Sequence, residues 1–541
     1  MKITGSSAAL LLLLLPALSP AAANFEVATR RVQAHTTFLA DDLLEGRGAG
    51  TAGYDLAARY VASQFQRIGL EPGADNGSYL QSMKFLESAN RIEAGRLSVR
   101  HAGGEDVLLP VNDMVAYPNI SEEKSSVTAP AVFLGFGVQA PELGHDDFAG
   151  MDLQGKIAVV LWGAPQQFPS TQRAHHSNRE QKRQLVAKLG AVGLVIIQTP
   201  SLEAIYPWAL VVSNNRFPSM GLLDASGAVV DGHPRLRAGA AVSRAAANRL
   251  FGASGHTAAE VFARAEAGEV LSFDLKAEIT VGGEATIRTV TSANVIGWLP
   301  GSDPALAGQP VVVTGHLDHL GIGAAVDGDS IYNGAMDNAV GIGLILAAAE
   351  QMAAGPRPAR PVLFAALTAE EKGLLGAYHL ARTPPSRVQQ FAANVNVDMP
   401  LFPAPVRSLI AWGAEHTTLG ALTLSAATKA GWVVTPDPMP EETIFVRSDQ
   451  YPFVQSGVPS IYLSSGMKPV DPAVDLAGMW STHLKTRYHK PSDDLSQPVD
   501  WPSAGALAVL ITDIVTDTAN ASPAPAWLPN DFFGGLYGRK K

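Results

Sequence analysis

From about residue 294 onward, short apolar stretches with strand character alternate with loops and helices. Strands are predicted at residues 310–314 and 361–367 and around Val395 and Val397, and helices at residues 341–352 and 374–381. Alternation of this kind indicates an α/β fold with a mainly parallel sheet covered by helices. Ligands of such sheets bind beyond the carboxyl ends of the strands, so the residues that follow each strand are the first candidates for a functional site.

Acidic and imidazole side chains follow each of these predicted strands. In chain order they are His316, Asp318, Asp337, Glu370, Glu371, Asp398 and His489. Singly, each has a simpler explanation, since Asp337 could cap a helix and the two glutamates could lie in a first helical turn. As a set, two histidines and three carboxylates at successive strand ends suit zinc. One bridging carboxylate could then hold two ions about 3.5–4 Å apart.

The amino-acid composition excludes several kinds of catalytic and binding site. The chain of 541 residues has no cysteine, which excludes disulfides, thiolate metal sites and a cysteine nucleophile. Any metal must therefore be bound by His, Asp or Glu. A net charge of −10 without a long basic run argues against a nucleic-acid partner. The motifs of serine hydrolases, of HExxH zinc peptidases and of P-loop enzymes are absent from the sequence.

The first 23 residues predict a cleavable export signal. Lys2 gives the positive start, residues 8–18 form a short apolar stretch, and the alanines at 21–23 suit cleavage. An uncleaved anchor is the alternative, although the stretch is short for a membrane span, and no later segment reaches the ~18 apolar residues that spanning needs. We expect an exported protein, periplasmic or extracellular, with no stable membrane span after cleavage.

The region between the predicted signal and residue 294 has a different pattern of predicted secondary structure. Apolar residues at helical spacing predict a helix from about Leu56 that ends at Gly69. A compact β-rich module follows, and its predicted strands end near Glu278. Its predicted elements are strands at residues 132–138, 157–162 and 192–197, and helices at residues 179–189 and 238–247.

Five motifs of the second half, in this order, resemble the co-catalytic dizinc aminopeptidase family, which is related to the glutamate-carboxypeptidase group of exopeptidases. They are GHLD at 315–318, GAMDN at 334–338, EEKGL at 370–374, NVDM at 396–399 and YH at 488–489. The resemblance covers nearly all of the chain after the signal and includes Glu45-Gly46-Arg47 near its start. It implies a three-layer α/β/α sandwich with a mainly parallel sheet, plus an inserted β-rich protease-associated (PA) domain.

The resemblance also implies a division of the chain. The expected parts are a signal peptide at 1–23, an N-terminal part of the peptidase domain at 24–120, a PA insert at 121–280, a zinc peptidase catalytic domain at 281–520 and a C-terminal tail at 521–541.

The same resemblance assigns two Zn²⁺ ions per chain to five ligands. His316 and Asp398 would bind one ion. Glu371 and His489 would bind the other, and Asp337 would bridge the two. His319 is excluded as a ligand, because the family's histidine is the one that precedes x-Asp.

Four further roles follow from the resemblance. Asp318 would hydrogen-bond to His316 and fix its tautomer. Glu370 would be the general base, taking a proton from the attacking water and passing it to the leaving amine. Tyr488 and Arg447 would stabilise the oxyanion or hold the substrate carbonyl. The sequence departs from the family pattern at Gln450, where relatives often carry His, which affects the expected shape of the substrate pocket.

These features predict an exported dizinc metallo-exopeptidase that acts on peptide substrates as an aminopeptidase. A carboxypeptidase of the glutamate-carboxypeptidase type is the closest alternative. It would need basic residues to bind a substrate carboxylate, and Arg447 alone does not decide between the two. A non-catalytic binding protein on the same scaffold is a third possibility, but such proteins have broken ligand sets, and here all five ligands and Glu370 are present.

Overall fold

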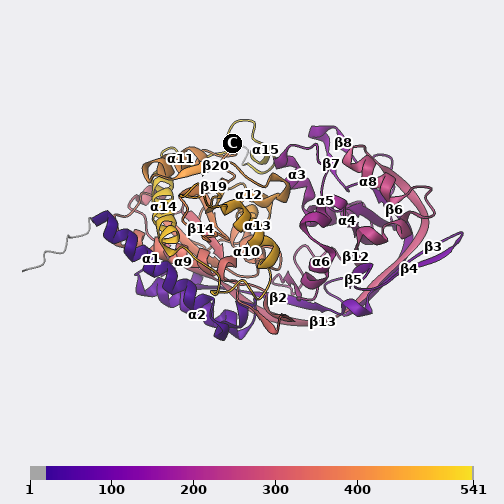
Figure 1. Cartoon of the computed structure of the whole chain (residues 1–541), viewed down its shortest axis with the longest axis horizontal. Coiled ribbons are helices and arrows are strands. Elements are labelled where there is room, and N and C mark those ends of the chain that lie inside the picture. The colour runs from indigo at the N-terminus through magenta and orange to yellow at the C-terminus, as the bar shows by residue number, and fades with distance from the viewer. Residues whose placement is uncertain (1–19, 539–541) are drawn as a thin grey trace, which may run out of the picture.

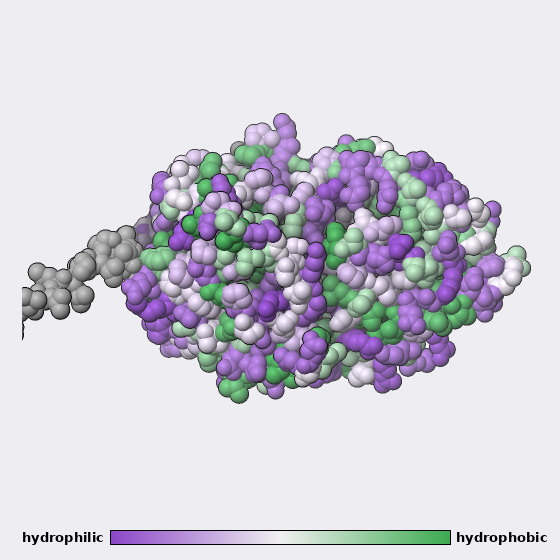
Figure 2. All heavy atoms as spheres, viewed as in Figure 1, coloured by the Kyte–Doolittle hydropathy of each residue, from purple (hydrophilic) through white to green (hydrophobic). Residues whose placement is uncertain are grey.

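The computed structural model describes residues 20–538, which form two lobes side by side (Figure 1). Strand β13 (Ser272–Leu299) runs along one side of the molecule and passes from one lobe to the other. Its first part pairs with strands of one lobe and its last part with strands of the other. The outer surface of both lobes is mostly hydrophilic, with small apolar groups, one of them along the seam between the lobes (Figure 2).

The lobe that contains both ends of the described chain is built on a mixed, mostly parallel sheet. Its central strands are, in spatial order, β17 (Val362–Leu367), β14 (Val311–His316), β18 (Ala393–Val397) and β21 (Ser460–Ser465), all parallel. The end of β13 adds antiparallel to β17 on one side. On the other side, β19 (Ser408–Trp412) pairs antiparallel with β21 and carries the edge strand β20 (Val433–Thr435).

Helices cover both faces of this sheet, because successive strand residues point to opposite sides. Val313 and Phe364 belong to one core, and the neighbouring Val312 and Leu363 to another. The first core is covered by α1 (Pro20–Leu39), α2 (Ala52–Arg67), α9 (Val340–Ala354), α11 (Leu419–Lys429) and α14 (Trp501–Asn520), and the second by α10 (Leu375–Arg382) and α12 (Gln450–Gln455). The predicted three-layer α/β/α arrangement is confirmed.

The second lobe has its own sheet. Four parallel strands form its centre in the order β6 (Lys124–Leu134), β9 (Ile157–Leu161), β10 (Gly193–Ile197) and β12 (Ala238–Val242). Helix α4 (Arg179–Lys188) connects β9 to β10, after the short helix α3 (Ser170–Ser177). The strands predicted at residues 132–138, 157–162 and 192–197 and the helix at 179–189 are present here with shifted ends.

Two features of this lobe differ from the predictions. Strands β3 (Arg96–His101), β4 (Gly104–Leu108) and β5 (Met114–Pro118) belong to its sheet, so the sheet begins ahead of the predicted boundary at residue 121. Polar and apolar residues alternate over too few positions in β3 and β4 for the sequence pattern alone to place the domain boundary there.

The alanine-rich stretch predicted as a helix at residues 238–247 begins instead with the buried strand β12, and only Arg244–Ala246 form a short 3-10 helix, so the prediction is wrong for the first half of the stretch. Burial between β10 and β5 overrides the helix propensity of alanine. The neighbouring backbone and Tyr117 leave no room at Gly239, where a Cβ would lie 2.7 Å from the Tyr117 ring.

The described residues include only part of the predicted signal peptide but most of the predicted C-terminal tail. Of the predicted signal, residues 1–19 lie outside the described residues, and α1 begins at Pro20. The predicted tail contains the short helix α15 (Phe532–Tyr537), and Phe533 is buried against Phe445 and Tyr451 of the first lobe. Among residues 20–538, no helix combines the length and apolarity needed to cross a bilayer.

Candidate metal centre

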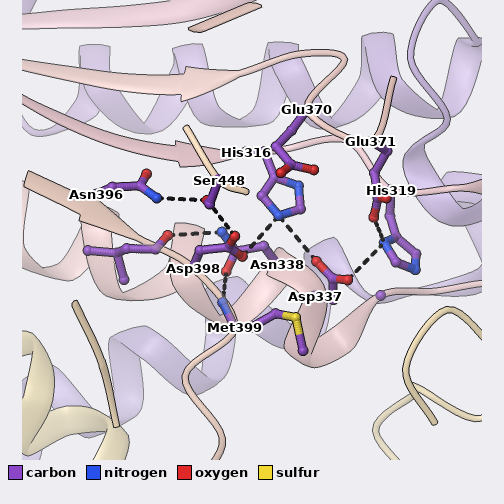
Figure 3. Close-up of polar contacts among 12 residues, drawn as sticks. His316, His319, Asp337, Asn338, Glu370, Glu371, Asn396, Asp398, Met399 and Ser448 are labelled. Atoms are coloured by element: carbon purple, nitrogen blue, oxygen red, sulfur yellow. Dashed lines mark hydrogen bonds and ion pairs between the residues drawn. The ribbon is translucent and has the colours of Figure 1, made fainter. Parts of the chain in front are cut away.

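Three parallel strands end at the same edge of the sheet and bring the candidate ligands together. His316 is the last residue of β14 and lies beside Leu367, the last residue of β17. Glu370 and Glu371 follow β17 after a short turn, and Asp398 directly follows β18. The carboxyl edge of the sheet therefore carries the residues that the strand-end rule selected (Figure 3).

Asp337 lies between two groups of ligand atoms. Its Oδ1 is 3.2 Å from Nε2 of His316, and that nitrogen is also 3.0 Å from Oδ1 of Asp398. Its Oδ2 is 3.4 Å from Nε2 of His489, which is 3.3 Å from Oε2 of Glu371. The structure thus places all five predicted metal ligands in one buried cluster, with one oxygen of Asp337 toward each group.

The loop that carries Asp337 has little freedom. The main-chain amides of Met336 and Asp337 donate to the Asp493 carboxylate at 3.2 and 3.1 Å. Gly334 has a φ of +58°, and a Cβ there would lie 2.2 Å from the main-chain oxygen of Asp337 and 2.5 Å from the ring of His319. Only glycine fits this position, because the positive φ disfavours a residue with a side chain and the neighbouring atoms leave no space for a Cβ.

Left-handed backbone conformations also occur at non-glycine residues around the cluster. Ala369, which precedes the two glutamates, has a φ of 56°, Met399 has 39° and His489 has 55°. Such conformations cost of order 1–3 kcal/mol each and concentrate at functional sites. Their position beside three of the candidate ligands is what a strained, functional centre would produce.

Asp398 is held by a chain of buried polar side chains. The Ser448 hydroxyl donates to its Oδ2 at 2.7 Å, and the Asn396 amide donates to the Ser448 oxygen at 2.9 Å (Figure 3). Asn396 also donates to Oε1 of Gln450 at 2.9 Å. Gln450, the departure from the family pattern, is therefore part of the support for a candidate ligand.

The expected contact between Asp318 and His316 takes a different form. Nδ1 of His316 lies 2.9 Å from the main-chain oxygen of Asp318, not from its carboxylate. The carboxylate accepts the amides of Glu370 and Glu371 at 3.1 and 3.4 Å instead. Asp318 still orients the histidine, but through its carbonyl, because its side chain points to the turn after β17. Burial raises the pKa of this carboxyl to about 6.

His319 belongs to the cluster although the sequence argument excluded it as a ligand. Its side chain is fully buried, and Nδ1 lies 2.7 Å from Oε1 of Glu371 and 3.9 Å from Oδ2 of Asp337. The signal available in the sequence was its position at the end of a predicted strand, directly after Asp318. The other histidines that the sequence offered lie elsewhere: His379 is on α10, and His483 is on α13 (Leu476–Thr486), facing Gln497.

A buried arginine from the N-terminal segment supports the centre from behind. The Arg47 guanidinium donates to the main-chain oxygens of Leu317, Asn333 and Gly334 at 2.8, 2.6 and 3.0 Å, and also to that of Leu39. The first three carbonyls belong to the loops that carry His316 and Asp337, and that of Leu39 lies at the end of α1. Burial lowers the pKa of Arg47 to about 10. This residue connects the Glu45-Gly46-Arg47 motif to the site.

The electrostatics of the cluster match a site for cations. Burial alone would raise the pKa of Asp337, but hydrogen bonding to His316 and the neighbouring imidazoles hold it well below its usual range. Burial raises the pKa of Glu370 well above its usual range, and the nearby carboxylates of Glu371 and Asp449 add to the effect. Buried carboxylates and imidazoles without thiols are a donor set that zinc accepts, so the residues present fit that metal.

Tyr488 and Arg447 lie beside the cluster, in the cleft between the lobes. This cleft has a volume of about 1320 Å³, and Glu370, Glu371 and His489 also line it. The Tyr488 ring stacks on the His489 ring, with centroids 3.8 Å apart. The Arg447 guanidinium donates to the main-chain oxygen and Oε2 of Glu442 at 3.1 and 3.2 Å. Both therefore border the space that a substrate would occupy.

Comparison with known proteins gives one family with a similar sequence and several solved structures with a similar fold. Residues 294–515 match peptidase family M28. No curated protein matches the chain in sequence. The aminopeptidase from Aneurinibacillus sp. strain AM-1 shares the fold at 19% identity and a TM-score of 0.52, over 96% of this chain and 100% of that one.

Two further solved structures are similar over most of their length. BSAP, a zinc aminopeptidase from Bacillus subtilis, has 19% identity and a TM-score of 0.44, covering 92% of this chain and 96% of its own. A peptidase M28 precursor from Shewanella amazonensis SB2B has 16% identity and a TM-score of 0.46, covering 94% and 98%.

The matched segment begins within the last part of β13 and ends within α14, so it contains all five clustered candidate ligands. Residues 294–515 of this chain are thus similar in sequence to peptidase family M28.

Proposed function

We propose that the chain is an exported, zinc-dependent aminopeptidase that removes N-terminal residues from peptides. The observation that carries the proposal is the position of Asp337, whose two oxygens face His316 on one side and His489 on the other. A bridging carboxylate with one further carboxylate on each side suits two zinc ions per chain. The aminopeptidase from Aneurinibacillus with the same fold supports this choice of reaction.

The residues divide the chemistry among them. Zinc held by the five ligands would supply Lewis acidity toward the scissile carbonyl and lower the pKa of an attacking water toward ~7. Glu370 takes the proton from that water and passes it to the leaving amine. Tyr488 and Arg447 donate hydrogen bonds to the oxygen on which negative charge develops.

The second lobe is proposed as a PA domain that shapes access to the cleft and carries no reaction chemistry. Export to the periplasm or the outside of the cell is proposed from the signal-like pattern of residues 1–23.

Metal content and a matched set of dipeptides test the proposal. Purified protein should contain about two zinc ions per chain, and removing them with a chelator should abolish hydrolysis until zinc is restored. Dipeptides with a free amino end should be cleaved even when the carboxyl end is amidated, and N-acetylated ones should not. Cleavage of the acetylated set alone would show a carboxypeptidase, and tight binding without cleavage would show a binding protein.

A further inference from the structure

We propose that the second lobe supplies an anion-binding subsite, centred on Arg179, that recognises a carboxylate of the peptide substrate on the leaving-group side of the scissile bond. The carboxylate is either the free carboxyl end of a short peptide or an acidic side chain. This inference rests on the proposed peptidase function and adds a substrate class to it.

The position of the subsite follows from the topology of the second lobe. The parallel strands β9 and β10 end at the cleft, where Trp162 follows β9 and Tyr206 caps the short helix α5 (Pro200–Ile205) after β10. Carboxyl ends of parallel strands are the usual place for ligands. The cleft is therefore bordered by two such edges, one with the metal centre and one with these aromatic residues.

Stacked side chains lead from this edge to the metal centre. The Arg179 guanidinium lies 5.0 Å from the centroid of the Trp162 ring, and the Trp162 and Tyr206 rings are nearly parallel at 9°, with centroids 6.3 Å apart. Arg447 lies 5.4 Å from the Tyr206 centroid on the first lobe's side. Tyr488, stacked on His489, also lines the cleft; burial raises its pKa well above the usual range, and the charge of Arg447 opposes this shift.

Arg179 differs from Arg447 in its partners. Arg447 is bound to Glu442, but within residues 20–538 no carboxylate pairs with Arg179. The adjacent Glu180 is bound instead to His233 at 2.5 Å. The Arg179 side chain is exposed in the cleft. Partial desolvation by the surrounding protein, with the charge of Arg447 adding to it, lowers its pKa. Stacking on Trp162 holds the guanidinium plane in place and leaves its N–H groups free for a bidentate carboxylate.

The charge around the cleft has the sign that this ligand requires. The whole chain carries −10, yet eight Lys and Arg line the cleft against six Asp and Glu. Two of those acids, Glu370 and Glu371, belong to the metal centre. Of the remaining four, Glu180, Asp231 and Glu442 are paired with histidine or arginine. The wall facing the substrate is thus positive, which favours a carboxylate over a neutral group.

Matched peptide pairs test the subsite. One pair compares the tripeptide Leu-Ala-Ala with its carboxyl-terminal amide, and the other compares Leu-Glu-Ala amide with Leu-Gln-Ala amide. At least one pair should show a carboxylate-to-neutral ratio of kcat/KM of about ten or more in the wild type, and the pair that does so identifies the source of the carboxylate. Arg179→Gln should bring that ratio close to one, mainly through KM. Arg179→Lys should give an intermediate ratio, because lysine keeps the positive charge but lacks the paired N–H groups with which a guanidinium binds both oxygens of a carboxylate.

Arg264→Gln, an exposed arginine of the same lobe outside the cleft, should keep the wild-type ratio. A wild-type ratio near one for both pairs, or an equal loss on both members of a pair in Arg179→Gln, overturns the subsite.

A binding measurement separates this inference from the peptidase proposal. Calorimetric binding of N-acetyl-Ala-Ala and its amide needs no hydrolysis. An Arg179-dependent preference for the acid without any peptidase activity would keep the subsite and reject the proposed function. Peptidase activity without any preference in rate or binding would reject the subsite alone.

Discussion

Nδ1 of His319 lies 2.7 Å from Oε1 of Glu371, so the two oxygens of this carboxylate face two different histidines. Oε2 faces His489 at 3.3 Å. His319 is fully buried, and its ring also closes the space that a side chain at Gly334 would need. The geometry makes His319 a positioning residue for Glu371.

His319→Gln should weaken the metal centre, because Glu371 loses the group that orients its carboxylate. Changes of residues that orient ligands typically cost 10–100-fold in metal affinity or activity. Competition with a chelator followed by metal analysis measures the affinity. His379→Gln, on the partly buried α10, should retain metal as the wild type does. Unchanged affinity in His319→Gln would show that Glu371 is oriented without it.

The neighbouring glutamates should respond differently to the same substitution. Glu370→Gln keeps its shape but cannot accept a proton, so the rate should fall by ~10²–10⁴ with metal content unchanged. Glu371→Gln weakens a ligand, so metal content should fall together with the rate. Measuring zinc and turnover in both variants checks the assignment. Metal loss in Glu370→Gln alone would reverse the two roles.

Arg47→Met should destabilise the protein strongly, because it leaves several buried main-chain oxygens without a donor. Each unsatisfied buried group costs about 1–3 kcal/mol, so we expect the free energy of unfolding to fall by roughly 3 kcal/mol or more. Metal affinity should fall as well, since the oxygens belong to the loops of His316 and Asp337. Denaturant unfolding and metal analysis measure the two effects, and the exposed Arg59→Met on α2 is the control.

Acid should destabilise the fold partly through His35. Its side chain is buried beside the Tyr60 hydroxyl at 2.8 Å, and burial, then the charge of Arg67, lower its pKa to about 4. Between pH 6.5 and 4 the unfolded chain binds a proton that the folded chain does not, so stability falls as pH falls through this window. The loss attributable to His35 is about 3 kcal/mol, from 1.36 kcal/mol for each unit of pKa shift.

His35→Gln should therefore show a smaller loss of stability than the wild type over the same range. Unfolding free energies at pH 7, 5.5 and 4 give the comparison. Parallel curves for the two proteins would mean that His35 keeps an ordinary pKa in the fold.

Local patterns in the sequence determined the sheet and the candidate ligands. The apolar stretches that became β14, β17 and β18, and the residues directly after them, are local properties of the chain, and parallel strands bring their carboxyl ends to one edge. His316, Glu371 and Asp398 could therefore be named without a structure. His489 and Asp337 came from the family resemblance and from a helix start, and they joined the same cluster.

Only the tertiary structure decided which groups support these ligands. Arg47 reaches Leu317 over 270 residues of sequence, and Asn396 meets Ser448 and Gln450 across 52 and 54 residues. The same holds for β12, whose burial overrode the helix propensity of alanine, and for Arg179 of the second lobe, which lines the same cleft as Glu370, Glu371 and His489. No periodicity encodes such contacts, because a hydrogen bond or a stacked pair between distant segments depends on how whole elements pack, and packing is set by all of their side chains at once.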